Sequence, residues 1–361
     1  MTEPEFLTLP DLASRAMAGG VVSADDEFFA EKENLILPSE PVFDPALFGH
    51  KGKVYDGWET RRRRSPGEDA AIVRLGVPGV VRGVVVDTAF FRGNFPPQVA
   101  VDGAWIDGYP GADELPGAHW RPLVPAAAAQ GDTRNRYEVS DPVAVTHVRL
   151  RIIPDGGVAR LRVHGEPTPD PAFLRGTVDL AAAENGGRVV DCSDLFYSSP
   201  SNIIAPGRSR VMGEGWENAR RRDGGNDHVT VGLAGQGTVD HVEIDTSYYI
   251  GNAPGMASLR GIARADDLEH PDRWVDLVPR TPLQPDCRHR FLVGPGSGSR
   301  PGDESGAAEP VRFVRLDVFP DGGIARLRVH GRLSSEALVL FAARVARARH
   351  AQARHTGLMH S

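Results

Sequence analysis

An acidic residue beside a run of arginines occurs twice in this 361-residue chain, and such a pairing could bind and protonate an anionic substrate. Glu59 precedes the first run and Glu217 precedes the second. The runs comprise Arg61, Arg62, Arg63 and Arg64 in the first copy and Arg220, Arg221 and Arg222 in the second. A guanidinium group can bind both oxygens of a carboxylate at once. The alternative is that these arginines lie on a solvated edge or pair with nearby acids such as Glu68 and Asp69.

Other polar residues recur at equivalent positions and could complete such a site. Carboxyl and imidazole groups can transfer protons near neutral pH, so the candidates for this role are Glu59, Asp26, Asp87 and His164. The candidates for substrate binding, besides the arginines, are Trp58, Thr88 and Asn94. The equivalents in the second copy are Glu217, Asp194, Asp245, Asn252 and His330. The structural alternative is that the aspartates and asparagines stabilise turns and that the histidines bond to backbone carbonyls.

Three neighbouring acids, Asp25, Asp26 and Glu27, favour the first copy as the catalytic one. Like charges raise one another's pKa, so one of these carboxyl groups could stay protonated and act as an acid. The second copy has a single acid at this place, Asp194. Their alternative role is to cap a solvated loop.

All of these residues belong to an internal duplication. Residues 86–94 match 244–252, and residues 154–165 return almost unchanged at 320–331. The offset is 168 near the start, 158 in the middle and 166 at the end, so the second copy loses 168 − 158 = 10 residues and then gains 166 − 158 = 8. We place the gain in the glycine-rich stretch Gly294–Glu309. We expect one repeat at 1–166, a second at 177–332 and a tail at 333–361.

Short β-strands are expected to position the candidate residues. Residues 80–91 are rich in valine and aromatics, and residues 242–247 alternate apolar and polar side chains. In residues 159–164 two arginines and a histidine alternate with apolar residues, which predicts that the charged side chains point outward. The fold class is therefore all-β, with an antiparallel β-sandwich in each repeat. Ser334–Arg349 has a serine cap and an apolar stripe, which predicts a C-terminal helix.

The composition narrows the range of functions. The net charge of −7 gives no reason to expect nucleic-acid binding, and no apolar run is long enough to span a membrane. The start of the chain lacks a basic-then-apolar signal, so we expect a cytoplasmic protein. The two cysteines form no metal-binding or disulfide pattern, and no familiar histidine motif is present. We therefore predict no metal site and no cofactor, although a divalent ion such as manganese held by distant carboxylates stays open.

The sequence resembles the allantoicase family over about residues 6–332. The resemblance rests on residues 9–14, 23–30, 57–64 and 87–94, and on the duplication itself. It implies two jelly-roll sandwiches of the galactose-binding type. It also implies hydrolysis of allantoate to (S)-ureidoglycolate and urea in purine and allantoin degradation. The arginines would then hold the carboxylate of allantoate, and an Asp, Glu or His would move the proton.

Two other interpretations remain at this stage. A jelly-roll protein could instead be a non-catalytic module that binds a carbohydrate or small ligand, since fold alone does not decide function. A sugar-binding site would favour exposed aromatics over clustered arginines. The chain could also be a regulatory or assembly protein in which one repeat has lost its site. A homo-oligomer is possible, and the sequence does not show which repeat is catalytic or whether the site is shared.

Overall fold

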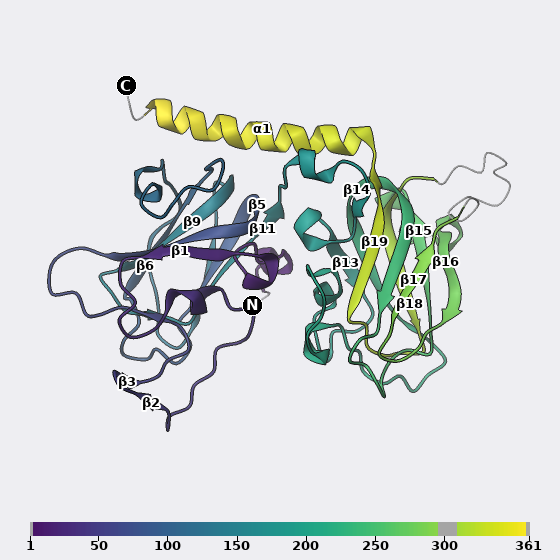
Figure 1. The fold of residues 1–361 in the computed structure, drawn as a ribbon, viewed down its shortest axis with the longest axis horizontal. Coiled ribbons are helices and arrows are strands. Elements are labelled where there is room, and N and C mark those ends of the chain that lie inside the picture. Colours follow the sequence, from purple (N-terminus) through teal and green to yellow (C-terminus); the bar gives the residue numbers. More distant parts are fainter. Residues whose placement is uncertain (1–2, 295–308, 359–361) are drawn as a thin grey trace. The chain divides into compact units, whose positions relative to one another are not determined.

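The structure is a computed structural model that describes residues 3–294 and 309–358. The expected insertion at Gly294–Glu309 thus lies almost wholly outside the described residues. The chain divides into two compact units: unit 1 comprises Met1–Thr168 with Arg344–Ser361, and unit 2 comprises Pro169–Ala343. Figure 1 shows that each unit is built mainly of strands.

The strands of unit 1 are β1 (Gly20–Ala24), β2 (Phe48–Gly49), β3 (Gly52–Lys53), β4 (Trp58–Glu59), β5 (Asp69–Asp87), β6 (Gln98–Ala104), β7 (Arg121–Ala128), β8 (Arg134–Glu138), β9 (Ala144–Ile153), β10 (Gly157–Val158) and β11 (Arg160–Pro167). Short 3₁₀ helices lie at Glu5–Thr8, Arg15–Met17, Lys32–Ile36 and Leu115–Gly117.

The strands of unit 2 are β12 (Val178–Asp179), β13 (Arg188–Cys192), β14 (Asp227–Asp245), β15 (Met256–Ile262), β16 (Val275–Pro282), β17 (Arg288–Leu292), β18 (Val311–Phe319) and β19 (Arg326–Leu333). Short 3₁₀ helices lie at Pro171–Leu174, Ala183–Asn185, Pro200–Ile204, Met212–Glu214, Ala265–Asp267 and Pro271–Arg273.

One long strand in each unit takes part in two layers of sheet. The first part of β5 pairs with β1 and β9, and β9 continues to β6 and β7. The last part of β5 pairs with β8 and β11. The register shifts between Arg74 and Gly79, where the strand passes from one layer to the other. β14 has the same arrangement, with β13 and β18 on its first part and β17 and β19 on its last. All these pairings are antiparallel, which confirms a β-sandwich in each repeat.

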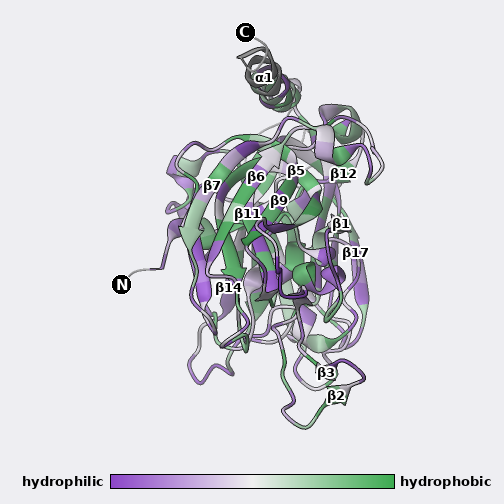
Figure 2. Cartoon of the chain, turned by 90° about the vertical axis from the view of Figure 1, so that its left-hand side faces the viewer, coloured by the Kyte–Doolittle hydropathy of each residue, from purple (hydrophilic) through white to green (hydrophobic). Residues whose placement is uncertain are grey.

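The core lies between the layers of each sandwich. In unit 1 it includes Val84 and Val86 of β5, and in unit 2 Val242 and Ile244 of β14, all fully buried. Figure 2 shows hydrophobic residues concentrated along the strands. Burial of a valine or isoleucine side chain contributes about 1.5–3 kcal/mol, so these alternating positions set the register of the long strands.

The C-terminal helix α1 (Ser335–Leu358) confirms the expected helix. The Ser334 hydroxyl caps it by accepting from the backbone N–H of Ala337 at 3.2 Å. Its buried stripe consists of Ala337, Phe341, Val345 and Ala348. Within unit 1, Val345 and Ala348 pack with Trp105 and Ala144. No helix among the described residues is long and apolar enough to cross a membrane.

Arg160 is the exception to the strand alternation. The pattern predicts that it points to solvent, but its side chain is 1% exposed. The segment 39–56, which lies more than 100 positions earlier in the chain, covers this side chain. The Arg160 guanidinium donates to the backbone carbonyls of Ser39 and Asp56 and pairs with the Asp56 carboxylate at 2.8 Å. Arg326 is held in the same way by the carbonyls of Gly207 and Glu214. The outward prediction was therefore wrong for this position, since strand alternation does not show which loops cover a face.

Replacing Arg160 should destabilise unit 1 strongly. Arg160→Met leaves a carboxylate and buried carbonyls without their donor, which costs about 3–5 kcal/mol for a buried pair. The free energy of unfolding in urea measures this loss. The control is Arg92→Met, since the Arg92 side chain is 79% exposed in its ion pair with Asp132 and such pairs contribute about 1 kcal/mol or less. Equal, small losses for both variants would show that the Arg160 contacts do not stabilise the fold.

Candidate active site

Three recurring segments meet at one place in unit 1. Glu59 of β4 lies opposite Gly157 of β10 in the pairing of these two strands. The N–H of Gly157 donates to the backbone carbonyl of Asn94 at 2.7 Å, and the Asn94 side-chain amide donates to Glu59 Oε1 at 2.7 Å. The backbone N–H of Arg63 donates to the Asp155 carboxylate at 2.7 Å. The turn at 154–157 therefore positions both the Glu59–Asn94 pair and the arginine run.

Two glycines allow this close approach. Gly156 has a φ of 143°, which side chains rarely adopt. A Cβ on Gly157 would lie 2.1 Å from the ring of Phe91. The glycine pair recurs at Gly322 and Gly323, so the repeated sequence block reflects a repeated geometric requirement.

Unit 2 contains the same arrangement. The Asn252 amide donates to Glu217 Oε1 at 2.6 Å, and the carbonyl of Asn252 accepts from the N–H of Gly323 at 2.8 Å. One difference lies next to it. Tyr249 stands where unit 1 has Phe91, and its hydroxyl donates to the backbone carbonyl of Met212 at 2.8 Å. The two copies therefore share a carboxyl–amide pair but differ in the surrounding groups.

The carboxyl group of Glu59 is partly removed from solvent. The side chain is half-buried, and this burial raises the pKa of Glu59, while the hydrogen bond from Asn94 lowers it by a smaller amount. Glu59 Oε2 accepts no hydrogen bond from any residue that the structure describes. A carboxyl group with a raised pKa and one free oxygen can hold a proton and deliver it to a ligand.

Removing the amide of Asn94 should raise the pKa of Glu59 further. Asn94→Ala deletes the hydrogen bond that favours the ionised carboxylate, so the protonated form persists to higher pH. A ¹³C NMR titration of the glutamate carboxyl groups measures this shift, with Glu59→Gln identifying the resonance. Asn252→Ala is the matched control and should leave the Glu59 resonance unchanged. An unchanged Glu59 titration in Asn94→Ala would contradict the pairing.

Two arginines of the first run pair with carboxylates, and two do not. Arg61 pairs with Asp26 at 3.0 Å, and Arg63 Nε lies 3.3 Å from Asp69 Oδ1. In contrast, Arg62 and Arg64 are exposed and make no ion pair or hydrogen bond to another described residue. Unit 2 repeats this division: Arg221 pairs with Asp223 and Asp227, whereas Arg220 and Arg222 are exposed without such a partner in the described part of the chain. Arg62 and Arg64 are thus the members of the first run that are free to bind an anion.

Asp26 does not have the properties expected of an acid. Burial acts to raise its pKa, but hydrogen bonds from Arg61 outweigh this effect and lower the pKa of Asp26. Its neighbours also have separate partners, because Asp25 accepts from the backbone N–H of Ala70 and Glu27 pairs with Lys32. The hypothesis that the three acids keep one another protonated was therefore wrong for Asp26.

Trp58 and Thr88 are fully buried and hold the scaffold in place. The indole N–H of Trp58 donates to the backbone carbonyl of Asp26 at 2.7 Å. The hydroxyl of Thr88 donates to the carbonyl of Gln130 at 2.6 Å. Neither side chain offers a surface to a ligand: Trp58 anchors the loop at Asp26, and Thr88 anchors the loop at residues 130–133.

Among the described residues, Asp87 and His164 make no hydrogen bond or ion pair with Glu59 or Asn94. Asp87 accepts from the N–H of Ala89 and lies 3.5 Å from Arg134, and burial raises its pKa. It lines a shallow depression of about 290 Å³. His164 Nδ1 lies 2.8 Å from the carbonyl of Leu9. His164 lies on β11 four residues after Arg160, which pairs with Asp87. Four residues span about 13 Å at the usual rise of a strand.

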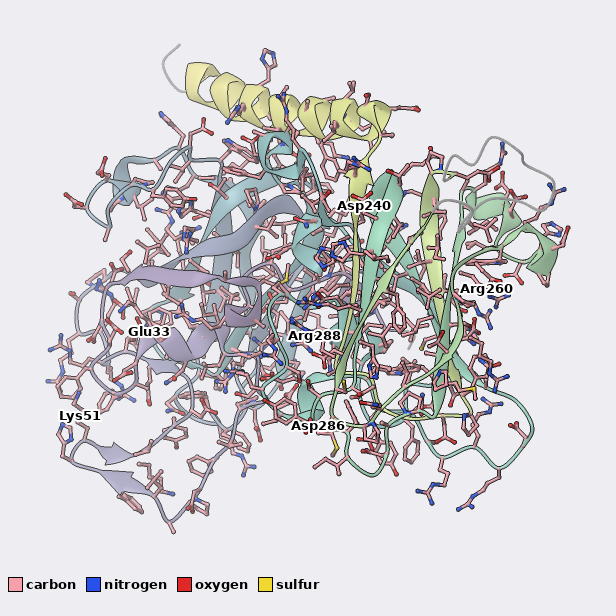
Figure 3. All side chains as sticks on the ribbon, turned by 45° about the vertical axis from the view of Figure 1, so that its right-hand side comes forward. Glu33, Lys51, Asp240, Arg260, Asp286 and Arg288 are labelled. Carbon is pink, nitrogen blue, oxygen red and sulfur yellow. The ribbon has the colours of Figure 1, made fainter. Side chains whose placement is uncertain are left out.

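The equivalent depression in unit 2, of about 300 Å³, is more highly charged. Asp245 lines it, as Asp87 does in unit 1, and His330 and Glu243 lie beside it. Arg288, the first residue of β17 and one of the residues labelled in Figure 3, also lines it. The remaining cations are Arg208, Arg326 and Arg328. Asp245 and His330 were among the predicted site residues, whereas Glu243 and these four arginines were not.

Comparison with known proteins agrees with this geometry. The model of the allantoicase repeat family matches residues 10–168 and 178–334. A probable allantoicase from Nocardia farcinica is 54% identical over 91% of this chain and 95% of its own length, and one from Streptomyces avermitilis is 48% identical over 94% and 89%. The solved allantoicase of Saccharomyces cerevisiae is 30% identical, with a TM-score of 0.75 over 91% of this chain and 96% of the yeast chain. The chain belongs to the allantoicase family.

Proposed function

We propose that the chain hydrolyses allantoate to ureidoglycolate and urea, with Glu59 of unit 1 as the proton donor. The observation that carries this proposal is the Glu59–Asn94 pair: a half-buried carboxyl group of raised pKa, with a free oxygen, three and five positions before the exposed Arg62 and Arg64 in the sequence. The relatives of this chain that are named as allantoicases support the reaction type. A carbohydrate-binding module would not need this combination of acid and guanidinium groups.

The first step breaks a carbon–nitrogen bond. Allantoate has a carboxylate and two ureido groups on one carbon. Protonated Glu59 gives its proton to the nitrogen of the departing ureido group, and the lone pair of the other ureido nitrogen forms a C=N bond as urea leaves. Protonation of the leaving group is needed because a urea anion is a poor leaving group; a positioned acid contributes about 10²–10⁴ in rate.

The second step uses the same carboxyl group in its ionised form. Glu59 accepts a proton from water while the hydroxide portion adds to the carbon of the C=N bond. This gives ureidoglycolate and returns Glu59 to its protonated state. One residue thus serves as acid and then as base, and no organic cofactor is needed.

The exposed arginines supply the cation for the substrate. We assign the carboxylate of allantoate to Arg62 or Arg64, because Arg61 and Arg63 already have carboxylate partners. The Asn94 amide keeps the Glu59 carboxyl oriented through Oε1 and leaves Oε2 for the ureido nitrogen. Asp26 and Trp58 act indirectly, since they fix Arg61 and the loop that precedes it.

Release of urea from allantoate by the purified chain tests the reaction. We expect stoichiometric urea and ureidoglycolate, and we expect the rate to survive treatment with a chelator. Absence of urea release, together with binding of simple sugars, would support the ligand-binding module instead. Loss of activity with chelator and its return with a divalent ion would contradict a metal-free reaction.

Three further properties belong to this proposal. The net charge of −7 supports an enzyme that does not bind nucleic acid. We place the enzyme in the cytoplasm, and we keep both a monomer and a homo-oligomer as candidate states. Size-exclusion chromatography with light scattering would check the oligomer by its mass relative to the 38.9 kDa chain.

A further inference from the structure

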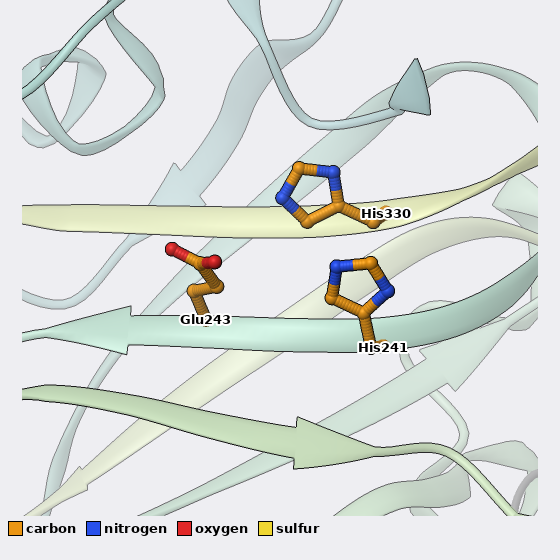
Figure 4. Close-up of side chains that lie close together, drawn as sticks. All are labelled: His241, Glu243 and His330. Atoms are coloured by element: carbon orange, nitrogen blue, oxygen red, sulfur yellow. The ribbon is translucent and has the colours of Figure 1, made fainter. Parts of the chain in front are cut away.

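Unit 2 contains a cluster of metal-binding side chains that unit 1 lacks. His241 and Glu243 lie two residues apart on β14, so both project from the same face of the strand. His330 of β19 lies directly opposite His241 in the pairing of the two strands. One nitrogen or oxygen atom from each of the three side chains falls within 4.8 Å of the others. Figure 4 shows the two imidazole rings and the carboxylate gathered on adjacent strands.

The rings of His241 and His330 contact each other but have no hydrogen-bond partner among the described residues. Their rings stack at 4.4 Å between centroids with an angle of 15°, and neither ring hydrogen-bonds to another described residue. His164, the counterpart of His330 in unit 1, differs because Leu9 engages its Nδ1. Stacked half-buried imidazoles without protein partners keep their nitrogens available as ligands.

We propose that His241, Glu243 and His330 bind one divalent first-row transition-metal ion of the kind that prefers nitrogen and oxygen ligands, such as zinc, cobalt or nickel. Two imidazoles and one carboxylate are a recurrent ligand set for such ions and leave positions open. Glu243 and His330 border the depression of about 300 Å³ in unit 2, so a water or an anion can complete the coordination. This site does not depend on the proposed hydrolysis.

Two neighbouring arginines would compete with a metal ion for the Glu243 carboxylate. Glu243 pairs with Arg290 at 3.0 Å and lies 3.6 Å from Arg288, so the ion competes with guanidinium groups for this carboxylate. A carboxylate can bind a metal through one oxygen and keep a hydrogen bond through the other. We therefore expect that removing Arg290 strengthens metal binding.

Unit 1 cannot form the same site. Gly83 lies opposite His164 where unit 2 has His241 opposite His330. Val85 takes the place of Glu243: Val85 pairs with Arg162 in unit 1, and Glu243 pairs with the equivalent Arg328 in unit 2. The site is thus a difference that arose between the copies, and His164 provides a matched control.

The test is titration of the untagged, full-length protein with Co²⁺, followed by visible d–d absorption and by calorimetry. Wild type should bind Co²⁺ with a visible spectrum, and its melting temperature should rise with Co²⁺ concentration, as expected for a ligand that binds the folded state. His241→Ala and Glu243→Gln should each weaken binding by about ten- to a hundredfold or more. Both should fold, which melting without metal verifies.

Two control variants make the result decisive. His164→Ala should bind Co²⁺ as wild type does, whereas Arg290→Ala should bind it more tightly. Wild-type protein without a Co²⁺ spectrum would overturn the proposal. Equal binding by wild type, His241→Ala and Glu243→Gln would also overturn it, because the ion would then occupy another place in the chain.

Discussion

Glu59→Gln is expected to lower kcat for urea release by about 10²–10⁴, the usual loss when a general acid or base is removed. Glutamine keeps the size of the side chain and can still bond to Asn94, but it has no proton to give to the leaving urea. Steady-state kinetics with allantoate, together with a thermal melt to verify folding, measure the effect.

The matched variant is Glu217→Gln in unit 2. The same carboxyl–amide pair exists there, so this change controls for any structural effect of removing the carboxylate. We expect a much smaller loss than for Glu59→Gln. A larger loss from Glu217→Gln would place the reaction in unit 2, and equal losses would mean that both copies work or that they share one site.

Arg62→Ala or Arg64→Ala is expected to raise KM for allantoate by about ten- to a hundredfold, because a charge-assisted hydrogen bond is worth about 1.5–3 kcal/mol. Both side chains are exposed without a carboxylate partner, so their loss should leave the melting temperature unchanged. Kinetics over a range of allantoate concentrations distinguish a change in KM from a change in kcat.

Arg220→Ala and Arg222→Ala serve as controls for overall charge. They remove an equally exposed cation from the corresponding run in unit 2, and should leave KM near the wild-type value. If neither Arg62→Ala nor Arg64→Ala changes KM, the exposed arginines of unit 1 do not bind the substrate and form only a solvated edge.

The duplication and the strand pattern were enough to predict the sandwiches. Alternation of apolar residues identified the core face of β14, where Val242 and Ile244 are fully buried. The match between 154–165 and 320–331 identified the duplication, and the structure shows that the Gly156–Gly157 turn is the geometric constraint that the two copies share. Local patterns sufficed here because each reflects a local requirement on backbone or burial.

The site was predicted only in part, because side-chain partners come from distant loops. The sequence placed Glu59 beside the arginines and identified Asn94, but not their hydrogen bond across 35 positions. It did not distinguish Arg61, which Asp26 engages, from Arg62, which is free. The spacing of His241 and Glu243 was visible, yet its meaning depended on His330 lying opposite on another strand.

The pH dependence of kcat/KM tests the central claim most directly. Glu59 must be protonated for the first step, and its raised pKa keeps that form present to higher pH than for an ordinary glutamate. For wild type, kcat/KM should therefore be constant at low pH and fall as the pH rises through the pKa of Glu59. In Glu59→Gln this fall should disappear from the residual activity, while Glu217→Gln should retain it. Persistence of the same fall in Glu59→Gln would contradict the assignment of Glu59 as the proton donor.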